Sequence, residues 1–390
     1  MTEATGTFTE SPERQALRAA VASLGAKFGR DYFQKKARAG EKTDELWAEA
    51  GKNGYLGVAV PSEYGGGGGG IGDLAAVCEE LAAAGCPLLM MVVSPAICGT
   101  IIGKYGTDDQ RAHWLPGFAE GTTKMAFSIT EPDAGSNSHN ITTTARRDGD
   151  GWLLSGGKTY ISGVDEASHV LVVARTEDAR TGRLKPALFI VPTDAPGFTA
   201  QMIEMDIISP EKQFTLFFDD IRLSPDALVG SEDAGLEQLF AGLNPERIMA
   251  ASFSLGSGRY ALAAATEYAK TRKVWDAPIG AHQAIQHPLA QSHIELQLAS
   301  LMTQKAAALY DSGDLMAAGE AANMAKYAAA EAACDTVDRA VQTHGGNGLA
   351  SEYGLGAMVA ATRLSRIAPV SREMILNFIA QFSLGLPKSY

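Results

Sequence analysis

The 390-residue sequence lacks the patterns that mark metal and disulfide proteins. Its four cysteines form no Cys-x-x-Cys pair, and its seven histidines are scattered without the spacing of metal ligands. We therefore expect no metal site, and we expect the cysteines to be reduced, buried thiols of a cytoplasmic protein. These cysteines are Cys78, Cys86, Cys98 and Cys334.

Long apolar runs and an excess of positive charge are also missing. No run of about 18 apolar residues occurs, and residues 1–10 contain no apolar signal core. The sequence therefore predicts neither a membrane span nor a signal peptide. The net charge of -12 argues against nucleic acid as a partner. It is compatible with a phosphate-bearing ligand, because a few local arginines can bind one.

The residues that are present predict three successive regions. Apolar residues recur at three- and four-residue spacing up to about residue 120 and again after residue 230, which is typical of helices. Between them, short strand-like runs are separated by turn residues, which indicates an antiparallel barrel or sandwich. We expect a helical domain at 1–121, a β domain at 122–230 and a helical bundle at 231–390. The expected strands are 125–130, 152–155, 169–174, 187–192 and 213–219.

Two stretches in these regions are interpreted from their local chemistry. Six consecutive glycines at residues 65–70 favour a flexible connector over a phosphate loop, which needs spaced glycines and a lysine or helix start. Asn244 followed by Pro245 has the form of a helix N-cap and first turn, so we expect either a helix start or a kink at Pro245.

Residues 126–137 are the most informative segment. A short apolar strand runs into a polar turn that collects Thr130, Gly135 and Ser136. This segment resembles the flavin-binding signature of the acyl-CoA dehydrogenase family. The resemblance implies that Phe127, Ile129 and Thr130 contact the flavin, and that Gly135 and Ser136 lie by the cofactor pyrophosphate and the acyl thioester.

Three further segments extend the resemblance over essentially the whole chain. Residues 155–162 are expected to form a turn and then a strand, with an aromatic residue and a hydroxyl against the flavin ring. Tyr160 and Ser162 stand there where Trp and Thr are usual in the family. Asp276 replaces a usual glycine after the Arg-Lys-x-aromatic segment. The third segment is the glycine-rich loop at residues 342–348, which in the family abuts the adenine end of the cofactor. In the family, the Arg-Lys-x-aromatic segment and the Gln after it reach the cofactor across a subunit interface. The cofactor contacts implied by the three segments are Tyr160, Ile161, Ser162, Arg272, Trp275, Gln283, Gln342, Gly345 and Gly346.

The sequence departs from the family at the usual position of the catalytic base. Pro369 stands where many members have a glutamate, and proline has neither a proton acceptor nor an N–H. Isovaleryl-type and long-chain-type relatives place the base directly before an arginine of the substrate cleft, which here is Glu246 before Arg247. We therefore expect Glu246 to be the base, and Asn244, Arg247 and Ser136 to contact the substrate. Ser371 and Glu373 are expected near the cofactor.

The expected fold is α+β: an N-terminal helical domain, a middle β domain and a C-terminal four-helix bundle. The expected activity is FAD-dependent oxidation of an acyl-CoA to a trans-2-enoyl-CoA, with electrons passing to an electron-transfer flavoprotein. A homotetramer or homodimer is implied by the resemblance. Two alternatives stay open: an oxidase, monooxygenase or enoyl-CoA reductase on the same fold, or a non-catalytic flavin or acyl-CoA binding protein.

Overall fold

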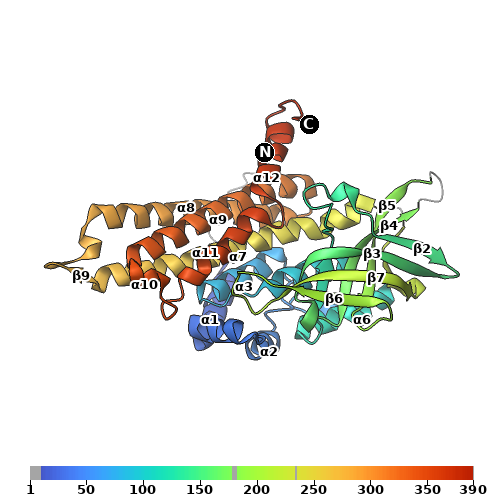
Figure 1. Cartoon of the computed structure of the whole chain (residues 1–390), viewed down its shortest axis with the longest axis horizontal. Helices are drawn as coiled ribbons and strands as arrows, with labels where there is room; N and C mark the ends of the chain where they lie inside the picture. The colour runs from blue at the N-terminus through green and yellow to red at the C-terminus, as the bar shows by residue number, and fades with distance from the viewer. Residues whose placement is uncertain (1–9, 178–181, 233–234, 390) are drawn as a thin grey trace.

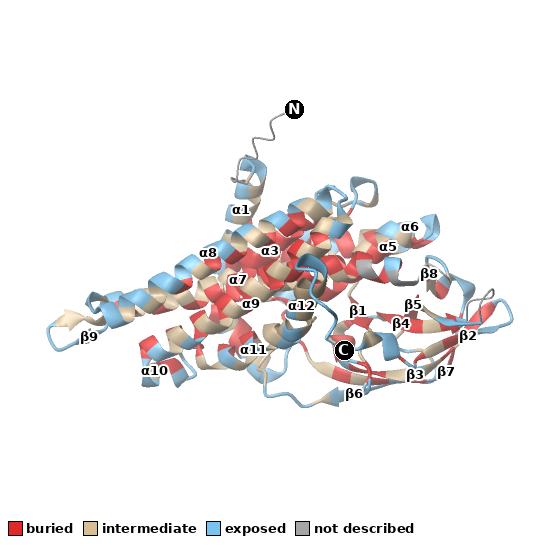
Figure 2. Ribbon diagram, turned by 90° about the horizontal axis from the view of Figure 1, so that it is seen from above, coloured by how far each residue is buried: buried red, intermediate tan, exposed pale blue. Residues whose placement is uncertain are grey.

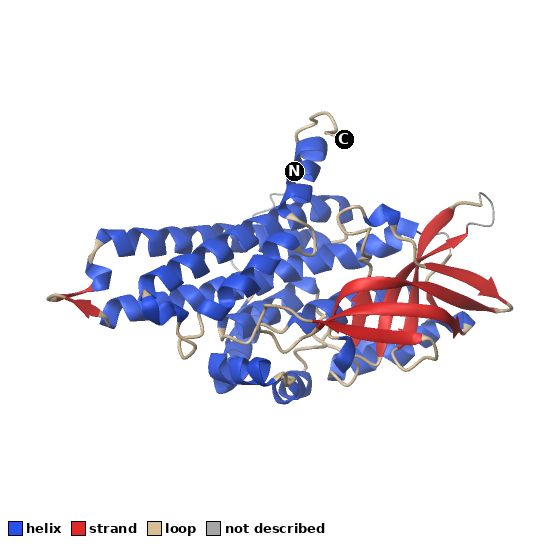
Figure 3. Ribbon diagram, in the orientation of Figure 1, coloured by secondary structure: helices blue, strands red, loops and turns tan. Residues whose placement is uncertain are grey.

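A computed structural model describes residues 10–177, 182–232 and 235–389. It confirms the expected order of a helical region, a sheet and a second helical region. The molecule is elongated, with the sheet at one end of the long axis and the tips of the C-terminal helices at the other (Figures 1 and 3). Within the described residues, no helix has the length and apolarity needed to cross a bilayer.

The N-terminal region is helical, as expected. Its first helix begins after Ser11, whose hydroxyl accepts a hydrogen bond from the Arg14 N–H at 3.2 Å. A continuous helical stretch at 89–105 changes to π-helical geometry around Pro95. The elements are α1 (Pro12–Ala39), α2 (Asp44–Lys52), η1 (Ser62–Tyr64), α3 (Ile71–Ala83), α4 (Leu89–Met91), η2 (Val92–Gly99), α5 (Thr100–Tyr105) and α6 (Asp108–Glu120).

The glycine run at residues 65–70 is not the open connector that the sequence suggests. The N–H groups of Gly67, Gly68 and Gly69 donate to the carbonyls of Gly57, Val60 and Val58 at 2.9 Å each. A Cβ on Gly66 would lie 2.1 Å from the Val60 carbonyl oxygen. The glycines therefore allow two backbone segments to pack against each other, which side chains would prevent.

The middle region is one sheet with the strand order β6-β7-β3-β2-β4-β5-β8, and β1 pairs with β4. Most pairings are antiparallel, but β1–β4 and β2–β4 are parallel. The expectation of a turn at residues 155–158 is wrong, because β3 runs through them with two register shifts. The elements are β1 (Met125–Ser128), η3 (Ser138–Asn140), β2 (Thr144–Asp148), β3 (Gly151–Ser162), η4 (Val164–Glu166), β4 (His169–Glu177), β5 (Leu184–Pro192), β6 (Phe198–Ile203), β7 (Gln213–Leu223), η5 (Pro225–Ala227) and β8 (Leu228–Val229).

The C-terminal region is a bundle of long helices in which α7, α8, α9 and α11 pack together. Of the two alternatives expected at Pro245, the helix start is wrong, since α7 begins ten residues earlier and Pro245 lies inside it. The elements are α7 (Gly235–Thr271), β9 (Lys273–Val274), β10 (Ala277–Pro278), η6 (Ile279–Ala281), α8 (Gln283–Asp311), α9 (Leu315–His344), α10 (Gly346–Leu349), α11 (Gly356–Ile367), α12 (Arg372–Phe378) and η7 (Ile379–Ser383).

Helix α7 is the centre of the molecule, and buried residues gather along it (Figure 2). Three glycines bring it close to its neighbours. A Cβ on Gly242 would lie 2.6 Å from Ile101 of α5, and one on Gly258 would lie 2.7 Å from Leu296 of α8. A Cβ on Gly256 would lie 2.3 Å from the backbone oxygen of Glu79 in α3. The absence of side chains at these points fixes how α7 sits against three helices.

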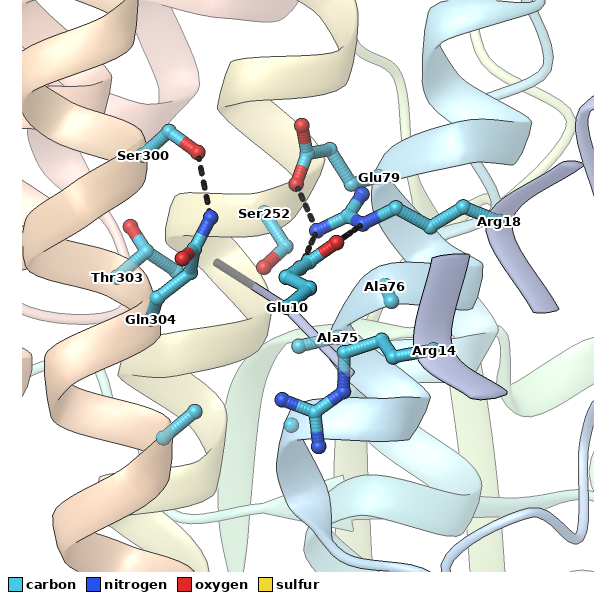
Figure 4. Close-up of a pocket in the computed structure, with 12 residues that line it drawn as sticks. Glu10, Arg14, Arg18, Ala75, Ala76, Glu79, Ser252, Ser300, Thr303 and Gln304 are labelled. Carbon is cyan, nitrogen blue, oxygen red and sulfur yellow. Dashed lines mark hydrogen bonds and ion pairs between the residues drawn. The ribbon is translucent and has the colours of Figure 1, made fainter. Parts of the chain in front are cut away.

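A partly buried cluster of charges also joins α1, α3 and α7, and Figure 4 shows its members Glu10, Arg18 and Glu79. Arg18 pairs with Glu10, Glu79 and Glu80 at 2.8, 3.1 and 2.7 Å. Arg259 of α7 pairs with Glu79 and Glu80 at 2.7 Å each. The cavity beside them is about 10 Å³, which holds about one water molecule. The cluster therefore links helices and is too small to hold a substrate.

The close approach at Gly256 gives a prediction about stability. Gly256→Ala should lower the free energy of unfolding by about 1–3 kcal/mol, because backbone atoms of α3 cannot move aside for the methyl group. Urea unfolding followed by circular dichroism measures this change. Gly103→Ala in α5 is the matched control, since its Cβ would meet Leu115 at an ordinary 3.9 Å. Equal stability of the two variants would contradict the packing argument.

Candidate active site

The loop after β1 is held by a buried ion pair. The Lys158 ammonium is fully buried and donates to Glu131 at 2.8 Å and to the Ile129 carbonyl at 3.0 Å. The Thr159 N–H donates to the Thr130 carbonyl at 2.9 Å. These bonds fasten residues 129–131 to β3 and place Thr130 beside the strand that carries Tyr160 and Ser162.

The Glu131 carboxylate also accepts hydrogen bonds from the backbone. It accepts hydrogen bonds from the backbone N–H groups of Thr142 and Thr143 at 2.6 and 3.0 Å. Burial alone would raise the pKa of Glu131, but the bonds from Lys158 and Thr142 lower it to about 2. Burial lowers the pKa of Lys158 to about 8, against the opposing effect of Glu131. We read this pair as the support of the loop.

The predicted ring contacts lie on an irregular part of β3. Tyr160 has a φ of 57° at a register shift, and its side chain is 60% exposed. Its neighbour Ile161 is buried, and the Ser162 hydroxyl donates to Gln213 Oε1 at 3.0 Å across the β3–β7 pair. An exposed aromatic ring followed by a hydroxyl two positions later fits one face of a planar cofactor. Sequence reasoning missed Gln213, because only the strand register shows that it faces Ser162.

The remaining predicted residues of this end surround the same loop. Phe127 is buried in β1, and Ile129 and Thr130 are half-buried. A bridge between Glu131 and Ala134 closes the turn, and Gly135 and Ser136 are exposed beyond it. A Cβ on Gly135 would meet nothing within 4 Å, so a ligand could approach the backbone there.

A second group of predicted residues lies at the far tip of the bundle. Trp275 forms the turn between β9 and β10, with a φ of 53° and 87% exposure. Arg272 precedes that hairpin, and Gln283 begins α8 after it. The hairpin and α10 lie at the end of the long axis opposite to β3 and β7 (Figure 1). One chain therefore does not bring these residues to Tyr160 and Ser162.

The glycine loop after α9 lies at this same tip. Gln342 is in the last turn of α9, Gly345 has a φ of 59°, and a Cβ on Gly345 or Gly346 would meet nothing within 4 Å. The loop is joined to α7 because the Tyr268 ring stacks on His344, with centroids 4.2 Å apart. Nearby, a groove of about 390 Å³ lies between α7 and α8. Apolar residues that line it include Leu262, Ala269, Ile285 and Leu289.

The predicted base lies in the middle of α7. Glu246 is half-buried and has no hydrogen bond or ion pair among the described residues. Burial raises the pKa of its carboxyl to about 7, although the charges of Arg247 and Lys326 act in the opposite direction. A carboxyl with this pKa can both accept and donate a proton near neutral pH.

The two predicted substrate contacts adjoin Glu246. Arg247 is buried, its Nη1 donates to the Leu243 carbonyl at 2.8 Å, and its Nε has no partner within the described part of the chain. Asn244 is buried, and its amide lies 3.5 Å from both Arg247 Nη1 and the Leu315 carbonyl. A buried guanidinium with a free N–H suits a polar ligand group.

Lys326 of α9 is a buried residue near Glu246 that sequence reasoning missed. It is 1% exposed, and its ammonium donates to the Val370 carbonyl at 2.5 Å. Val370 follows Pro369 in the loop between α11 and α12, so Lys326 joins that loop to the surroundings of Glu246. Alanine-rich α9 gives no sequence signal for this role, since its lysine reads as an ordinary helix residue.

Two predicted cofactor contacts lie after this loop. Ser371 is the N-cap of α12, and its hydroxyl accepts a hydrogen bond from the Met374 N–H at 3.2 Å. The Glu373 carboxylate forms an ion pair with Arg372 at 2.8 Å and is largely exposed. The structure places both residues at the start of α12, distant in sequence from the loop that carries Thr130.

Comparison with known proteins identifies relatives along the whole chain. Three family models match: the N-terminal domain of acyl-CoA dehydrogenase at residues 11–122, the middle domain at 126–221 and the C-terminal domain at 233–384. The acyl-CoA dehydrogenase FadE12 of Mycobacterium tuberculosis is 66% identical over 383 residues, which cover 98% of this chain and 99% of FadE12.

Two solved structures have the same fold. A glutaryl-coenzyme A dehydrogenase in complex with glutaryl-CoA is 29% identical, with a TM-score of 0.93 and 98% of each chain covered. A glutaryl-CoA dehydrogenase from Mycobacterium smegmatis in complex with FADH2 is 26% identical, with a TM-score of 0.89, covering 99% of this chain and 98% of the other.

The ion pair behind the loop gives a second prediction. Lys158→Met should lower the free energy of unfolding by about 3–5 kcal/mol, because it leaves the Glu131 carboxylate buried without its counter-charge. Chemical unfolding of Lys158→Met, Glu131→Gln and the double variant measures the coupling. We expect the double variant to lose less free energy of unfolding than the two single variants lose together. Strictly additive losses would show that the two groups do not support each other.

Proposed function

This chain belongs to the acyl-CoA dehydrogenase family, a family of flavoprotein oxidoreductases, and we propose that it oxidises an acyl-CoA thioester to the trans-2-enoyl-CoA with Glu246 as base. The observation that carries the proposal is the half-buried, unpaired Glu246 carboxyl in the middle of α7. Pro369, at the alternative position, has no group that accepts a proton.

We propose FAD as the cofactor. Its ring would lie against Tyr160, Ile161 and Ser162 and the loop that carries Thr130, where an exposed aromatic ring and a hydroxyl are available. When bound, FAD supplies the acceptor for the hydride that leaves the β-carbon of the substrate. Thr130 and the exposed Gly135 and Ser136 would hold the cofactor and the thioester in position.

The chain's own residues would divide the remaining work. The Glu246 carboxylate would take the α-proton of the thioester, which is held close enough by contacts to Arg247, Asn244 and Ser136. Arg247 has a free buried N–H for a polar group of the substrate. Partial burial already raises the pKa of Glu246 to about 7, and a bound substrate would remove more water from it.

We propose that the enzyme is a homo-oligomer, a tetramer or a dimer. The tip residues Arg272, Trp275, Gln283, Gln342, Gly345 and Gly346 are too far from β3 to hold the same cofactor within one chain (Figure 1). Helix α8 also exposes a stripe of large apolar residues, Ile294, Leu298 and Leu301, at 58, 63 and 47% exposure. A second copy of the chain that covers this stripe would bring its tip to the cofactor.

By analogy with the family, we propose that an electron-transfer flavoprotein removes the electrons after each turnover. The net charge of -12 would favour encounter with a partner that carries a basic patch.

Substitution of the base gives a direct test. Glu246→Gln should slow the reduction of bound FAD by acyl-CoA by about 10²–10⁴-fold under anaerobic conditions, since the amide cannot accept the proton. Stopped-flow absorbance of the flavin measures this rate. Glu267→Gln is the matched control on the same helix, because Glu267 is exposed. Undiminished reduction by Glu246→Gln would remove Glu246 from the role.

The pKa of the base gives a pH dependence. Glu246 must be deprotonated to act as a base, so kcat/KM should rise with pH and level off above an apparent pKa near 7. In Glu246→Gln this limb should be absent from the residual activity. Because the folded-state pKa lies above the unfolded value, Glu246 should also contribute stability at low pH that is lost as the pH rises through 7. A pH–rate profile in steps across neutrality, with FAD content as a check, measures the first effect.

A further inference from the structure

The loop that carries Pro369 is anchored by a charge. Lys326 is almost fully buried on α9, and its only hydrogen bond within the described residues goes to the Val370 carbonyl. An ammonium has three donors, so two of its N–H groups are left for other groups or water. A buried lysine with one neutral acceptor is costly unless negative charge is close to it.

The nearby charges show which group that is. Burial lowers the pKa of Lys326 to about 8, and the charge of Arg247 on α7 acts in the same direction. The carboxylates of Glu246 on α7, Glu331 on α9 and Glu373 on α12 act in the opposite direction. Cys98 of η2 also lies within the electrostatic reach of Glu246. Glu331 pairs with Arg366 at 2.8 Å and with Arg372 at 3.4 Å.

Glu373 likewise pairs with Arg372, at 2.8 Å. The carboxylates of Glu331 and Glu373 are therefore already compensated by arginines. The Glu246 carboxylate forms no ion pair among the described residues, so it is the negative group left to balance the buried charges of Arg247 and Lys326, which both act on it.

We propose that Lys326 is a positioning residue for the base: it fixes the Pro369 loop through the Val370 carbonyl and keeps a positive charge beside Glu246. This proposal rests on the function proposed above. With Glu246 ionised, the cluster of Glu246, Arg247 and Lys326 carries one net positive charge.

The charge suits the first step of the reaction. The α C–H bond of the thioester breaks, the proton goes to Glu246, and the electron pair enters the thioester, which becomes enolate-like. Glu246 is then neutral, so the charges of Arg247 and Lys326 are no longer balanced by it and favour the new negative charge. Lys326 therefore stabilises the product of deprotonation at a site where Pro369 offers no N–H.

The experiment separates deprotonation from hydride transfer. An acyl-CoA analogue with sulfur at the β-position can lose its α-proton but cannot give up a hydride, and its anion next to oxidised FAD gives long-wavelength charge-transfer absorbance. Titrating this absorbance with pH on the FAD-loaded protein gives an apparent pKa for deprotonation of the bound analogue. Absence of the band in the unsubstituted protein would count against the proposed function itself.

The variants isolate charge from contact. Lys326→Gln keeps a donor for the Val370 carbonyl but removes the charge, and Lys326→Arg keeps the charge. In Lys326→Gln we expect the titration midpoint to rise by about one pH unit or more. This shift corresponds to a tenfold or larger loss of the analogue's anion at a fixed pH below the midpoint. In Lys326→Arg the midpoint should stay close to that of the unsubstituted protein. Lys305→Met, at an exposed lysine of α8, should not shift it.

A purely structural lysine predicts a different result. Lys326→Gln would then lower the melting temperature or the FAD content, but the fraction of this variant that still binds FAD would titrate at the original midpoint. That result would overturn the proposal. An equal shift in Lys326→Arg and Lys326→Gln would overturn it as well, because the charge would then not be responsible.

Discussion

The close packing of α7 is the constraint on which the arrangement of the molecule depends. Gly242, Gly256 and Gly258 let this one helix approach α5, α3 and α8 at distances that leave no room for a Cβ. At Gly256 the neighbouring atoms belong to the α3 backbone, so close contact with α3 fixes the position of α7 there. Glu246 and Arg247 lie between the first and second of these glycines, so their burial follows from helix packing.

The sequence predicted the kind of elements well and their ends less well. Helices were expected throughout the region after residue 230, because alanine- and leucine-rich periodicity extends over many turns there. The helix start at Pro245 was wrong because the Asn-Pro pair is a local signal, and tertiary packing of the residues before it extended the helix through the proline. In β3, Gly156 and Gly157 suggested a turn, but pairing with β7 keeps them in the sheet as part of a bulged strand.

The candidate site was predictable as a set of residues but not as an arrangement. The motifs identify Thr130, Tyr160 and Ser162 in the β domain, and Arg272 and Gly345 in the bundle. The spacing of these residues in the sequence does not show that the two groups lie at opposite ends of the folded molecule. The supporting residues are less visible still. Lys158 and Lys326 are lysines in ordinary-looking segments, and only the three-dimensional structure shows that both are buried and hold loops by backbone carbonyls.

The chemistry of Glu246 does not by itself fix the direction of the reaction. A carboxyl with a pKa of about 7 is divided between its two protonation states at neutral pH. It can therefore take a proton from a saturated thioester or give one to an enoyl thioester, and both directions pass through the same negatively charged intermediate of the substrate.

The direction must then be set by the tendency of the flavin to accept a hydride and by the partner that removes or supplies electrons. Beside the proposed ring position, the Ser162 hydroxyl already donates to Gln213 Oε1, which leaves its oxygen to accept a hydrogen bond. Such an acceptor favours the hydride-bearing form of a flavin over the oxidised one. By this reasoning the Ser162–Gln213 pair of the β domain bears on the direction of the reaction as well as the base does.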